Sequence, residues 1–451
     1  MINKLYHVII IILRMKTRKE RKSNRFTRKN GGKVIESGGF GCVFKPALQC
    51  NKHSKREKNK VSKLMTTNKA NSEYGLIMEI RKKLNKIKNY KDYFIINDLT
   101  LCSPSKLTKS DLNNFKKCTA LPKSNITKKN INKSLRKIMS LNIPDGGIPI
   151  DDYTENNPVQ NFKALNTKFM DLLLHGIIPM NEKHIYHNDI KTSNVLVKQT
   201  NHKLLTRLID WGLSIEYIPF QNNKFPSVFQ NKPLQYNLPF SLILFADDFN
   251  IKYAKFIQKK KDNHLDPKRL KLFMKKFIYY WIKTRGKGHY VMIRYLISIL
   301  HNTKNRNEER NVSSSTLEDI TTYDSSTEVI TNSEDVIKNT IEDENAIRTI
   351  INYIIPILVE FTEGNSLNLT KYLNNVYIHL VDIYGFINIY CPLLESLYKN
   401  FAILTKNQML IFELIKGLYT KYLYSPTNKS INIEDLINDL KKLDLLFENE
   451  I

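Results

Sequence analysis

The sequence predicts a mixed α+β protein in which a smaller, strand-rich part precedes a larger, mainly helical part. Apolar residues stand on both sides of a glycine cluster within 34–44, which is typical of a two-stranded hairpin. Long apolar runs with helical periodicity, broken by Gly and Pro, fill 347–451 and predict helices. Hydrophobic residues make up 41% of the 451 residues, so the chain can form a sizeable core and wholesale disorder is excluded.

The chain carries a large excess of positive charge. Lysine and arginine number 71 against 43 aspartates and glutamates, which gives a formal net charge of +28. Such an excess attracts polyanions such as nucleic acid, nucleotides, anionic membranes or acidic proteins. No recognised DNA- or RNA-binding module is present, so nucleic-acid binding through the basic tail is not expected as the main role. A sequence crowded with Lys, Asn and Ile is also typical of an AT-rich genome.

The five cysteines show no CxxC spacing and predict neither a disulfide framework nor a zinc or redox site. A reducing, intracellular and cytoplasmic location is therefore expected. The cysteines are Cys42, Cys50, Cys102, Cys118 and Cys391.

Residues 1–30 are expected to form a poorly ordered basic tail. The apolar run Leu5–Leu13 is too short to span a bilayer, which takes about 20 apolar residues. Basic residues follow this run where a signal peptide would have small residues, so an interfacial anchor ranks second and a secretory signal last. Met15 is an alternative start. No stable membrane span is expected.

The most specific pattern is HNDIKTSN at 187–194, followed by Asp210-Trp211-Gly212. Its residue types match the needs of phosphoryl transfer. Asp189 would orient the attacking hydroxyl and accept its proton, and Lys191 would neutralise charge on the transferred group. Asn194 and Asp210 would hold magnesium ions that bridge the nucleotide phosphates. The glycine cluster adds a turn whose backbone amides can approach phosphate oxygens, although many hairpins carry Gly-Gly turns.

Together these motifs resemble those of the eukaryotic-type protein kinase superfamily, and the setting is similar to the kinases of large DNA viruses. The resemblance covers about residues 34 to 215. It implies a bilobal fold, with a small antiparallel-sheet N-lobe holding one main helix and a larger, mainly helical C-lobe. It also implies ATP and Mg²⁺ as cofactors and a protein substrate, which the basic charge predicts to be acidic. A viral enzyme would work in the host cytoplasm or the virion. Lys191 favours serine/threonine over tyrosine specificity, and the sequence leaves the oligomeric state open.

A strand lysine and a helical glutamate are expected between the two motifs. Lys63 fits the lysine because Val61 lies on the same strand face, and Lys60 is its rival. Glu73 fits the glutamate because it adjoins an apolar helical stripe, whereas Glu79 does not. The resemblance assigns nucleotide binding to Gly38, Gly39, Phe40, Gly41, Val43, Val61, Lys63, Glu73 and Leu196. Asp151 or Asp152 would reach the ribose.

The implied kinase domain is 31–301, with the N-lobe at 31–145 and the start of the C-lobe at 146–301. Its N-lobe includes a basic insertion at about 89–136 and ends in a strand and hinge near 137–147. The acidic, Ser/Thr-rich stretch 302–346 is expected to be an insertion or linker, inert or carrying self-phosphorylated serines at Ser313–Ser315. The helical segment 347–451 is expected to complete the C-lobe.

Four positions depart from the kinase pattern. Glu36 replaces the first glycine of the loop, and Trp211 replaces the phenylalanine of DFG. Asn188 replaces the arginine that a phosphorylated activation loop neutralises, which predicts activity without such phosphorylation. An APE motif is missing, and only Asn237–Phe240 stands near its place.

Two other classes remain open. A small-molecule kinase of the aminoglycoside or choline type has a similar HxDxxxxN loop, and an inactive pseudokinase scaffold would explain the unusual C-terminal part. A buried helix is expected over Gly286–Leu300, with His289 as a core or capping residue.

Overall fold

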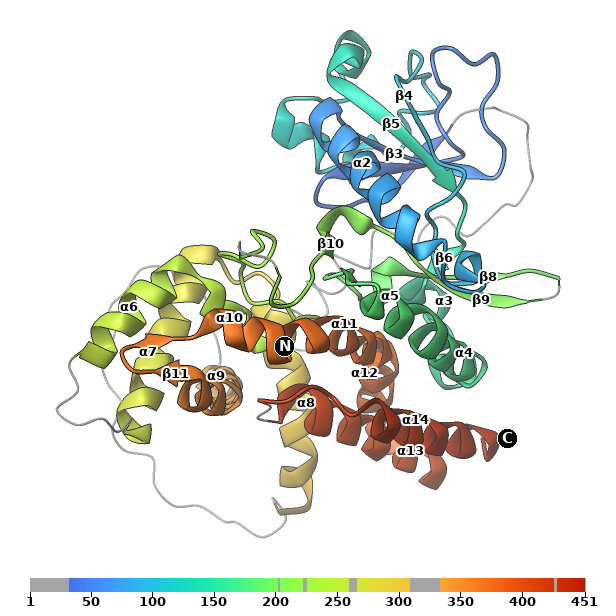
Figure 1. The fold of residues 1–451 in the computed structure, drawn as a ribbon. Helices are drawn as coiled ribbons and strands as arrows, with labels where there is room; N and C mark the ends of the chain where they lie inside the picture. Colours follow the sequence, from blue (N-terminus) through green and yellow to red (C-terminus); the bar gives the residue numbers. More distant parts are fainter. Residues whose placement is uncertain are drawn as a thin grey trace.

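The computed structural model describes residues 32–201, 203–221, 225–258, 266–308, 333–425 and 428–450. The protein is a mixed α+β structure with a small antiparallel sheet region above a larger helical part (Figure 1). The expectations for residues 1–30 and for Ser313–Ser315 lie outside the described residues.

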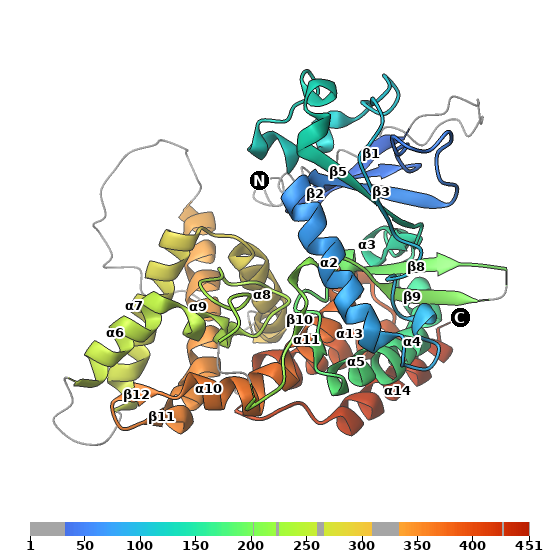
Figure 2. The same ribbon diagram turned by 45° about the horizontal axis from the view of Figure 1, so that its top comes forward.

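The strand-rich part is built on a five-stranded antiparallel sheet with the order β1-β2-β3-β5-β4. Its strands are β1 (Lys33–Ser37), β2 (Gly41–Lys45), β3 (Lys60–Thr66), β4 (Thr100–Cys102) and β5 (Ile138–Pro144). Strands β1 and β2 form the hairpin that the glycine cluster predicts. Helix α2 (Thr67–Leu84) follows β3 directly and runs from the sheet toward the helical part (Figure 2). Its buried stripe includes Glu73, Ile77 and Ile80, as the periodicity predicts.

Residues 103–137 fold into a compact cap of short turns over the hairpin. Four of these turns are 3-10 helices: η2 (Phe115–Lys117), η3 (Leu121–Ser124), η4 (Ile131–Lys133) and η5 (Leu135–Lys137). Their apolar side chains enclose a second core with β1 and β2, in which Phe115 and Ile131 are buried beside Phe44. The predicted insertion is therefore a folded element with its own core.

The prediction that the cysteines are unpaired is wrong. Cys42 on β2 is disulfide-bonded to Cys118 of the cap, and Cys50 is bonded to Cys102 on β4, while Cys391 is free and buried. The partners are 76 and 52 residues apart. The packing of the cap brings Cys118 to Cys42, whereas Cys102 is placed by the pairing of β4 with β5 in the sheet. The cysteines thus no longer support a reducing compartment.

Two small sheets join the strand-rich part to the helices. One contains β6 (Ile148–Pro149), β8 (Val195–Gln199) and β9 (Leu204–Leu208), and the other pairs β7 (Ile185–Tyr186) with β10 (Ile215–Glu216). The helices beside them are α3 (Ile150–Tyr153), α4 (Pro158–Leu172) and α5 (Ile178–Glu182), with a π-helical turn between α4 and α5. The loops of these sheets carry the polar motifs.

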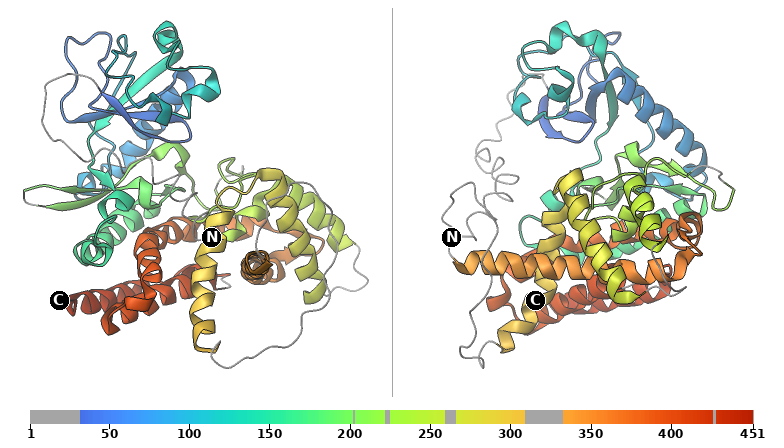
Figure 3. Two further views of the ribbon diagram at one scale, coloured as in Figure 1. Left: turned by 180° about the vertical axis from the view of Figure 1, so that it is seen from behind. Right: turned by 90° about the vertical axis from the view of Figure 1, so that its left-hand side faces the viewer.

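The helical part has two groups, which Figure 3 shows from two further directions. The first group is α6 (Asp247–Gln258), α7 (Pro267–Arg285), α8 (Tyr290–Glu308) and α9 (Ser333–Phe361). A short hairpin, β11 (Thr362–Glu363) and β12 (Ser366–Leu367), leads to α10 (Leu369–Tyr372), α11 (Ile378–Ile387), α12 (Cys391–Lys399), α13 (Lys406–Leu418) and α14 (Ile433–Glu448). Helices α13 and α14 begin at side-chain caps, Thr405 and Asn432. Both groups share one hydrophobic core with α2, α4 and β8.

Two helix boundaries differ from the sequence prediction. Helix α8 begins at Tyr290 and not at Gly286, because Gly286 and Gly288 have φ angles of +83° and +42° that a helix does not allow. The acidic stretch 302–346 is shorter as a linker than predicted, since α8 extends to Glu308 and α9 begins at Ser333.

One helical stretch within the described residues, Leu369–Lys399, is long and apolar enough to cross a membrane by length and composition. Its apolar window is 89% buried inside the protein, as a core helix would be. This is consistent with the expected lack of a stable membrane span.

Candidate functional site

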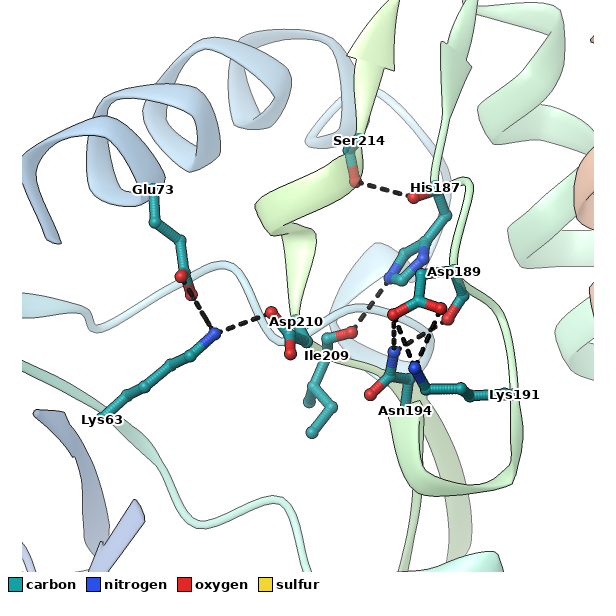
Figure 4. A network of polar contacts seen from close by, with 9 residues as sticks. All are labelled: Lys63, Glu73, His187, Asp189, Lys191, Asn194, Ile209, Asp210 and Ser214. Atoms are coloured by element: carbon teal, nitrogen blue, oxygen red, sulfur yellow. Dashed lines mark hydrogen bonds and ion pairs between the residues drawn. The ribbon is translucent and has the colours of Figure 1, made fainter. Parts of the chain in front are cut away.

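Three charged residues meet where the sheet faces the helical part. The Lys63 ammonium on β3 donates to both Glu73 carboxylate oxygens on α2, at 2.8 and 2.9 Å, and to Asp210 Oδ1 at 2.7 Å (Figure 4). Lys63 and Glu73 are each only 7% exposed. The structure thus brings Asp210, 147 residues further along the chain than Lys63, to a lysine and a glutamate that are 10 residues apart.

The electrostatics of this cluster favour the charged forms of Lys63 and Asp210, whereas burial raises the pKa of Glu73. Burial alone would lower the pKa of Lys63, but the carboxylates of Asp210 and Glu73 outweigh it and raise this pKa. Burial alone would also raise the pKa of Asp210, but Lys63 holds it below its usual range. Asp210 therefore stays an anion that can accept a cation.

The rival residues point elsewhere. Lys60 donates to Glu57 Oε1 at 2.7 Å and to Thr100 Oγ1 at 3.1 Å, and not to Glu73 or Asp210. Glu79 forms an exposed pair with Lys82. Of the alternatives in the sequence, only Lys63 and Glu73 come together.

The second cluster surrounds Asp189 in the loop after β7. Lys191 Nζ lies 3.0 and 2.9 Å from the two Asp189 carboxylate oxygens. Asn194 Nδ2 donates to the Asp189 carbonyl and to its Oδ2, at 2.8 and 2.9 Å. Because the Asn194 nitrogen faces Asp189, the Asn194 Oδ1 points away from the carboxylate (Figure 4). This oxygen is in an orientation in which it could act as a metal ligand.

Asn237 is a member of this cluster that sequence reasoning did not assign to the site. Its fully buried amide donates to Asp189 Oδ1 at 3.0 Å and to the Ile190 carbonyl at 3.3 Å. The amide comes from the segment before η9 (Phe240–Phe245), 48 residues further along the chain. With Lys191 and Asn194, it fixes the orientation of the Asp189 carboxylate.

Asp382 on α11 holds the backbone of the same loop. Its two carboxylate oxygens accept the backbone N–H groups of His187 and Asn188, at 2.8 and 2.9 Å. Asp382 is fully buried, and burial raises its pKa although both N–H groups oppose that shift. A single charged residue in the apolar run 378–387 was the available sequence signal.

His187 connects the loop to the segment that carries Asp210. Its Nε2 lies 2.9 Å from the Ile209 carbonyl, and since a carbonyl only accepts, Nε2 carries the proton. The imidazole also packs against the Trp211 ring at a centroid distance of 4.9 Å. Trp211 is buried, as expected for a residue with a packing role.

Asn188 takes a conformation suited to its side chain. Its φ angle is +60°, a region that asparagine tolerates better than most residues. Its Nδ2 donates to the Leu213 carbonyl at 3.2 Å, directly after the Asp210–Gly212 motif. A neutral amide therefore makes the link between the loop at 187–194 and the segment beyond Gly212.

The glycines of the hairpin turn differ in what they require. A Cβ on Gly41 would lie 2.9 Å from the Leu64 carbonyl oxygen and closer still to Met65, so this glycine is needed for the approach of β2 to β3. Around Gly38 and Gly39 there is open space, as a turn that covers a ligand would need. Phe40 at the tip is partly exposed, and its ring lies near Gly212.

The apolar residues expected at the nucleotide base lie on two elements. Val43 pairs with Lys63 across β2 and β3, so Val43, Val61 and Lys63 share one face of the sheet. Leu196 on β8 packs beside Gly146 of the connection after β5. Thr192 Oγ1 donates to Asp151 Oδ2 at 2.8 Å, which ties α3 to the loop at 187–194.

Glu36 lies exposed on β1, where the kinase pattern would have a glycine.

Outside the site, a cavity of about 470 Å³ lies between Lys86 and Lys183, and none of the predicted site residues lines it.

The described residues contain no group of three or more His, Cys, Asp or Glu side chains arranged to hold a metal. Asp210 and Asn194 offer two hard oxygen donors on neighbouring segments. Such a pair suits Mg²⁺, which keeps several waters and takes its other ligands from substrate phosphates. The donor set therefore fits magnesium bound together with a nucleotide.

No protein-family model matches the chain, and no curated protein matches it significantly. The class of the protein must therefore be argued from the site.

Proposed function

We propose that the chain is an ATP-dependent serine/threonine protein kinase with a bilobal, kinase-like fold. The observation that carries this proposal is the meeting of two charge clusters, Lys63–Glu73–Asp210 and Asp189–Lys191–Asn194, between the sheet and the helical part. The first has the groups needed to hold nucleotide phosphates, and the second has those needed to direct a hydroxyl.

The first cluster would seat the nucleotide. Lys63, kept cationic by Glu73, would bind the α- and β-phosphates, and the apolar face with Val43 and Val61 would cover the base. Magnesium, held by Asp210 and Asn194, would neutralise the phosphate charge. Lys63 contacts Asp210 directly, and this contact keeps both side chains in position for the nucleotide.

The second cluster would direct the acceptor. The oxygen of a serine or threonine hydroxyl attacks the γ-phosphorus, the bond to the β–γ bridging oxygen breaks, and ADP leaves. Asp189 orients the hydroxyl and takes its proton. Lys191, 2.9 Å from Asp189, lies where it can neutralise charge on the transferred group. Asn237 and Asp382 position Asp189 and contact no reacting atom.

The contacts of Asn188 support activity without loop phosphorylation. An arginine at this position would leave a buried cation that a phosphate group must neutralise. The Asn188 amide is neutral and already bonds to the Leu213 carbonyl. The link between the two segments is therefore complete without an added charge.

The test is transfer of labelled phosphate from ATP to proteins such as casein and basic histone proteins, with kanamycin and choline as small-molecule acceptors. Asp189→Asn and Asp210→Ala should each reduce transfer at least about 10³-fold, because the first removes the base and the second a metal ligand. Asp435→Asn, an exposed carboxylate on α14, is the matched control and should retain full activity.

Two outcomes of this test contradict the proposal. Transfer to kanamycin or choline and not to protein would make the chain a small-molecule kinase. ATP binding without transfer to any acceptor would make it a scaffold. Wild-type turnover in either active-site variant would refute the site assignment.

A further inference from the structure

The cap formed by residues 103–137 carries an unusual concentration of positive charge. Ten of its 35 residues are basic and only Asp111 is acidic. Nine of the basic side chains are exposed and Lys117 is partly exposed. They are Lys106, Lys109, Lys116, Lys117, Lys123, Lys128, Lys129, Lys133, Arg136 and Lys137.

The one acidic side chain does not neutralise this surface. Asp111 is 1% exposed and accepts from Arg56 at 2.8 Å, from the Gly32 N–H at 2.7 Å and from the Thr108 N–H at 2.8 Å. Among the described residues, none of the ten basic side chains forms an ion pair or a hydrogen bond. The cap therefore presents ten cations whose charge is not balanced locally.

The basic face of α7 provides a contrast. It also carries several lysines, but acidic residues of α9 lie against it, and Lys275 pairs with Glu344 at 2.8 Å. Exposed lysines are common along this chain, so composition alone explains a basic surface. Composition does not explain a folded element from which exposed acids are missing.

The cap is also rigid enough to present its charges in a fixed arrangement. Phe115, Leu121 and Ile131 are buried in its own core, and the Cys42–Cys118 disulfide joins it to the sheet. Each of the four 3-10 turns carries at least one cation on this framework. Cations held in this way lose less entropy on binding than those of a flexible tail.

From these features we infer that the cap binds the phosphate backbone of double-stranded nucleic acid. Lysines interspersed with Asn, Ser and Thr side chains are the groups that contact phosphates without reading sequence. Phe115 is the only aromatic residue of the cap and is buried, so no aromatic surface is present on which single-stranded bases could stack. None of the large exposed hydrophobic side chains of the described residues belongs to the cap, which disfavours a membrane surface.

The inference does not depend on kinase activity. A bound duplex would concentrate the protein, whatever its reaction, on partners that share the same nucleic acid. The contacts are electrostatic, so the affinity should be independent of sequence and should fall steeply with salt.

The test compares two full-length variants that lose the same charge in different places. The cap variant changes Lys116, Lys123, Lys128, Lys129 and Lys133 to Gln. The control changes five exposed lysines of α6 and α7 to Gln, namely Lys255, Lys268, Lys271, Lys276 and Lys283. The basic sequence before Gly32 is the same in both, so its contribution cancels.

Fluorescence anisotropy would measure binding to labelled DNA and RNA duplexes of about 24 base pairs over a range of salt concentrations. The cap variant should bind at least about tenfold more weakly than the control near 0.15 M salt. Its plot of log K against log salt should be shallower, by roughly 0.9 for each lost phosphate contact. Comparing the affinities for the DNA duplex and the RNA duplex shows which of the two the cap prefers.

Equal losses in the two variants would overturn the inference, because net charge and not the cap would then cause binding. The inference would also be overturned if the cap substitutions weakened binding to phosphatidylserine vesicles more than they weakened binding to duplexes. Thermal melting of both variants checks that they remain folded. This is expected because the ten substituted lysines, five in each variant, are all solvent-exposed.

Discussion

The carboxylate of Asp382 offers the sharpest test of how the loop at 187–194 is held. Replacing it with asparagine keeps the size and shape of the side chain but leaves one oxygen to accept where two now accept. One of the N–H groups of His187 and Asn188 would then face an amide nitrogen, without an acceptor, inside the core.

The size of the effect follows from the geometry. A hydrogen bond to a charged group contributes about 1.5–3 kcal/mol, and an unsatisfied buried donor costs about 1–3 kcal/mol. A neutral amide is easier to bury than a carboxylate, which offsets part of this loss. We expect Asp382→Asn to lower the free energy of unfolding by about 2 kcal/mol and the melting temperature by roughly 2 °C.

The rate of phosphoryl transfer should fall by more than the loss of stability alone would cause. A shift of the loop by about 1 Å would displace Asp189 and cost roughly 100-fold in kcat, with little change in the KM for ATP. Tyr384→Phe, two residues along α11, is the matched control. Its hydroxyl is buried with no hydrogen-bond partner in the described structure, so its removal should leave stability and transfer unchanged. The reasoning is refuted if Asp382→Asn melts and turns over like Tyr384→Phe.

Three other changes test separate contacts. Lys63→Gln should lower kcat/KM for ATP at least about 100-fold, whereas Lys60→Gln should change it less than about threefold; equal losses in the steady-state assay would contradict the contacts described. Phosphatase-treated protein should keep its full transfer rate, and a mass spectrum showing that activity appears only after loop phosphorylation would contradict this expectation. Asn188→Ala should reduce the transfer rate by removing the hydrogen bond to the Leu213 carbonyl. Burial alone would raise the pKa of Asp111, but Arg56 and Thr108 lower it from 3.8, so its contribution to stability is present above pH 3.8 and lost as the pH falls below that value. Urea unfolding should therefore show Asp111→Asn to be about 2 kcal/mol less stable than wild type near pH 6, with a gap that narrows below pH 3.8; a gap that is constant with pH would contradict the ion pair.

The sequence was informative where residues act within a short segment. The spacing of Asp189, Lys191 and Asn194 is local, and a tight loop after β7 brings their side chains together. The apolar stripe beside Glu73 likewise identified the helix face that turns toward β3. In both cases the residues in contact are at most 10 positions apart along the chain.

Contacts between distant segments could not be predicted in this way. Asn237 looked like part of an absent motif, because nothing near it shows that the chain folds back onto Asp189. The pairing of Cys42 with Cys118 depends on the core of the cap, whose apolar residues have no regular period.

The distance along the chain between the catalytic loop and Asp382 has a consequence for synthesis. His187 and Asn188 leave the ribosome nearly two hundred residues before the carboxylate that accepts their N–H groups. Until α11 emerges and packs, the loop lacks its buried acceptor, and any nascent chain or fragment ending before residue 382 should be unable to hold it in place. A protein arranged in this way would gain activity late, only when most of its helical part has been translated.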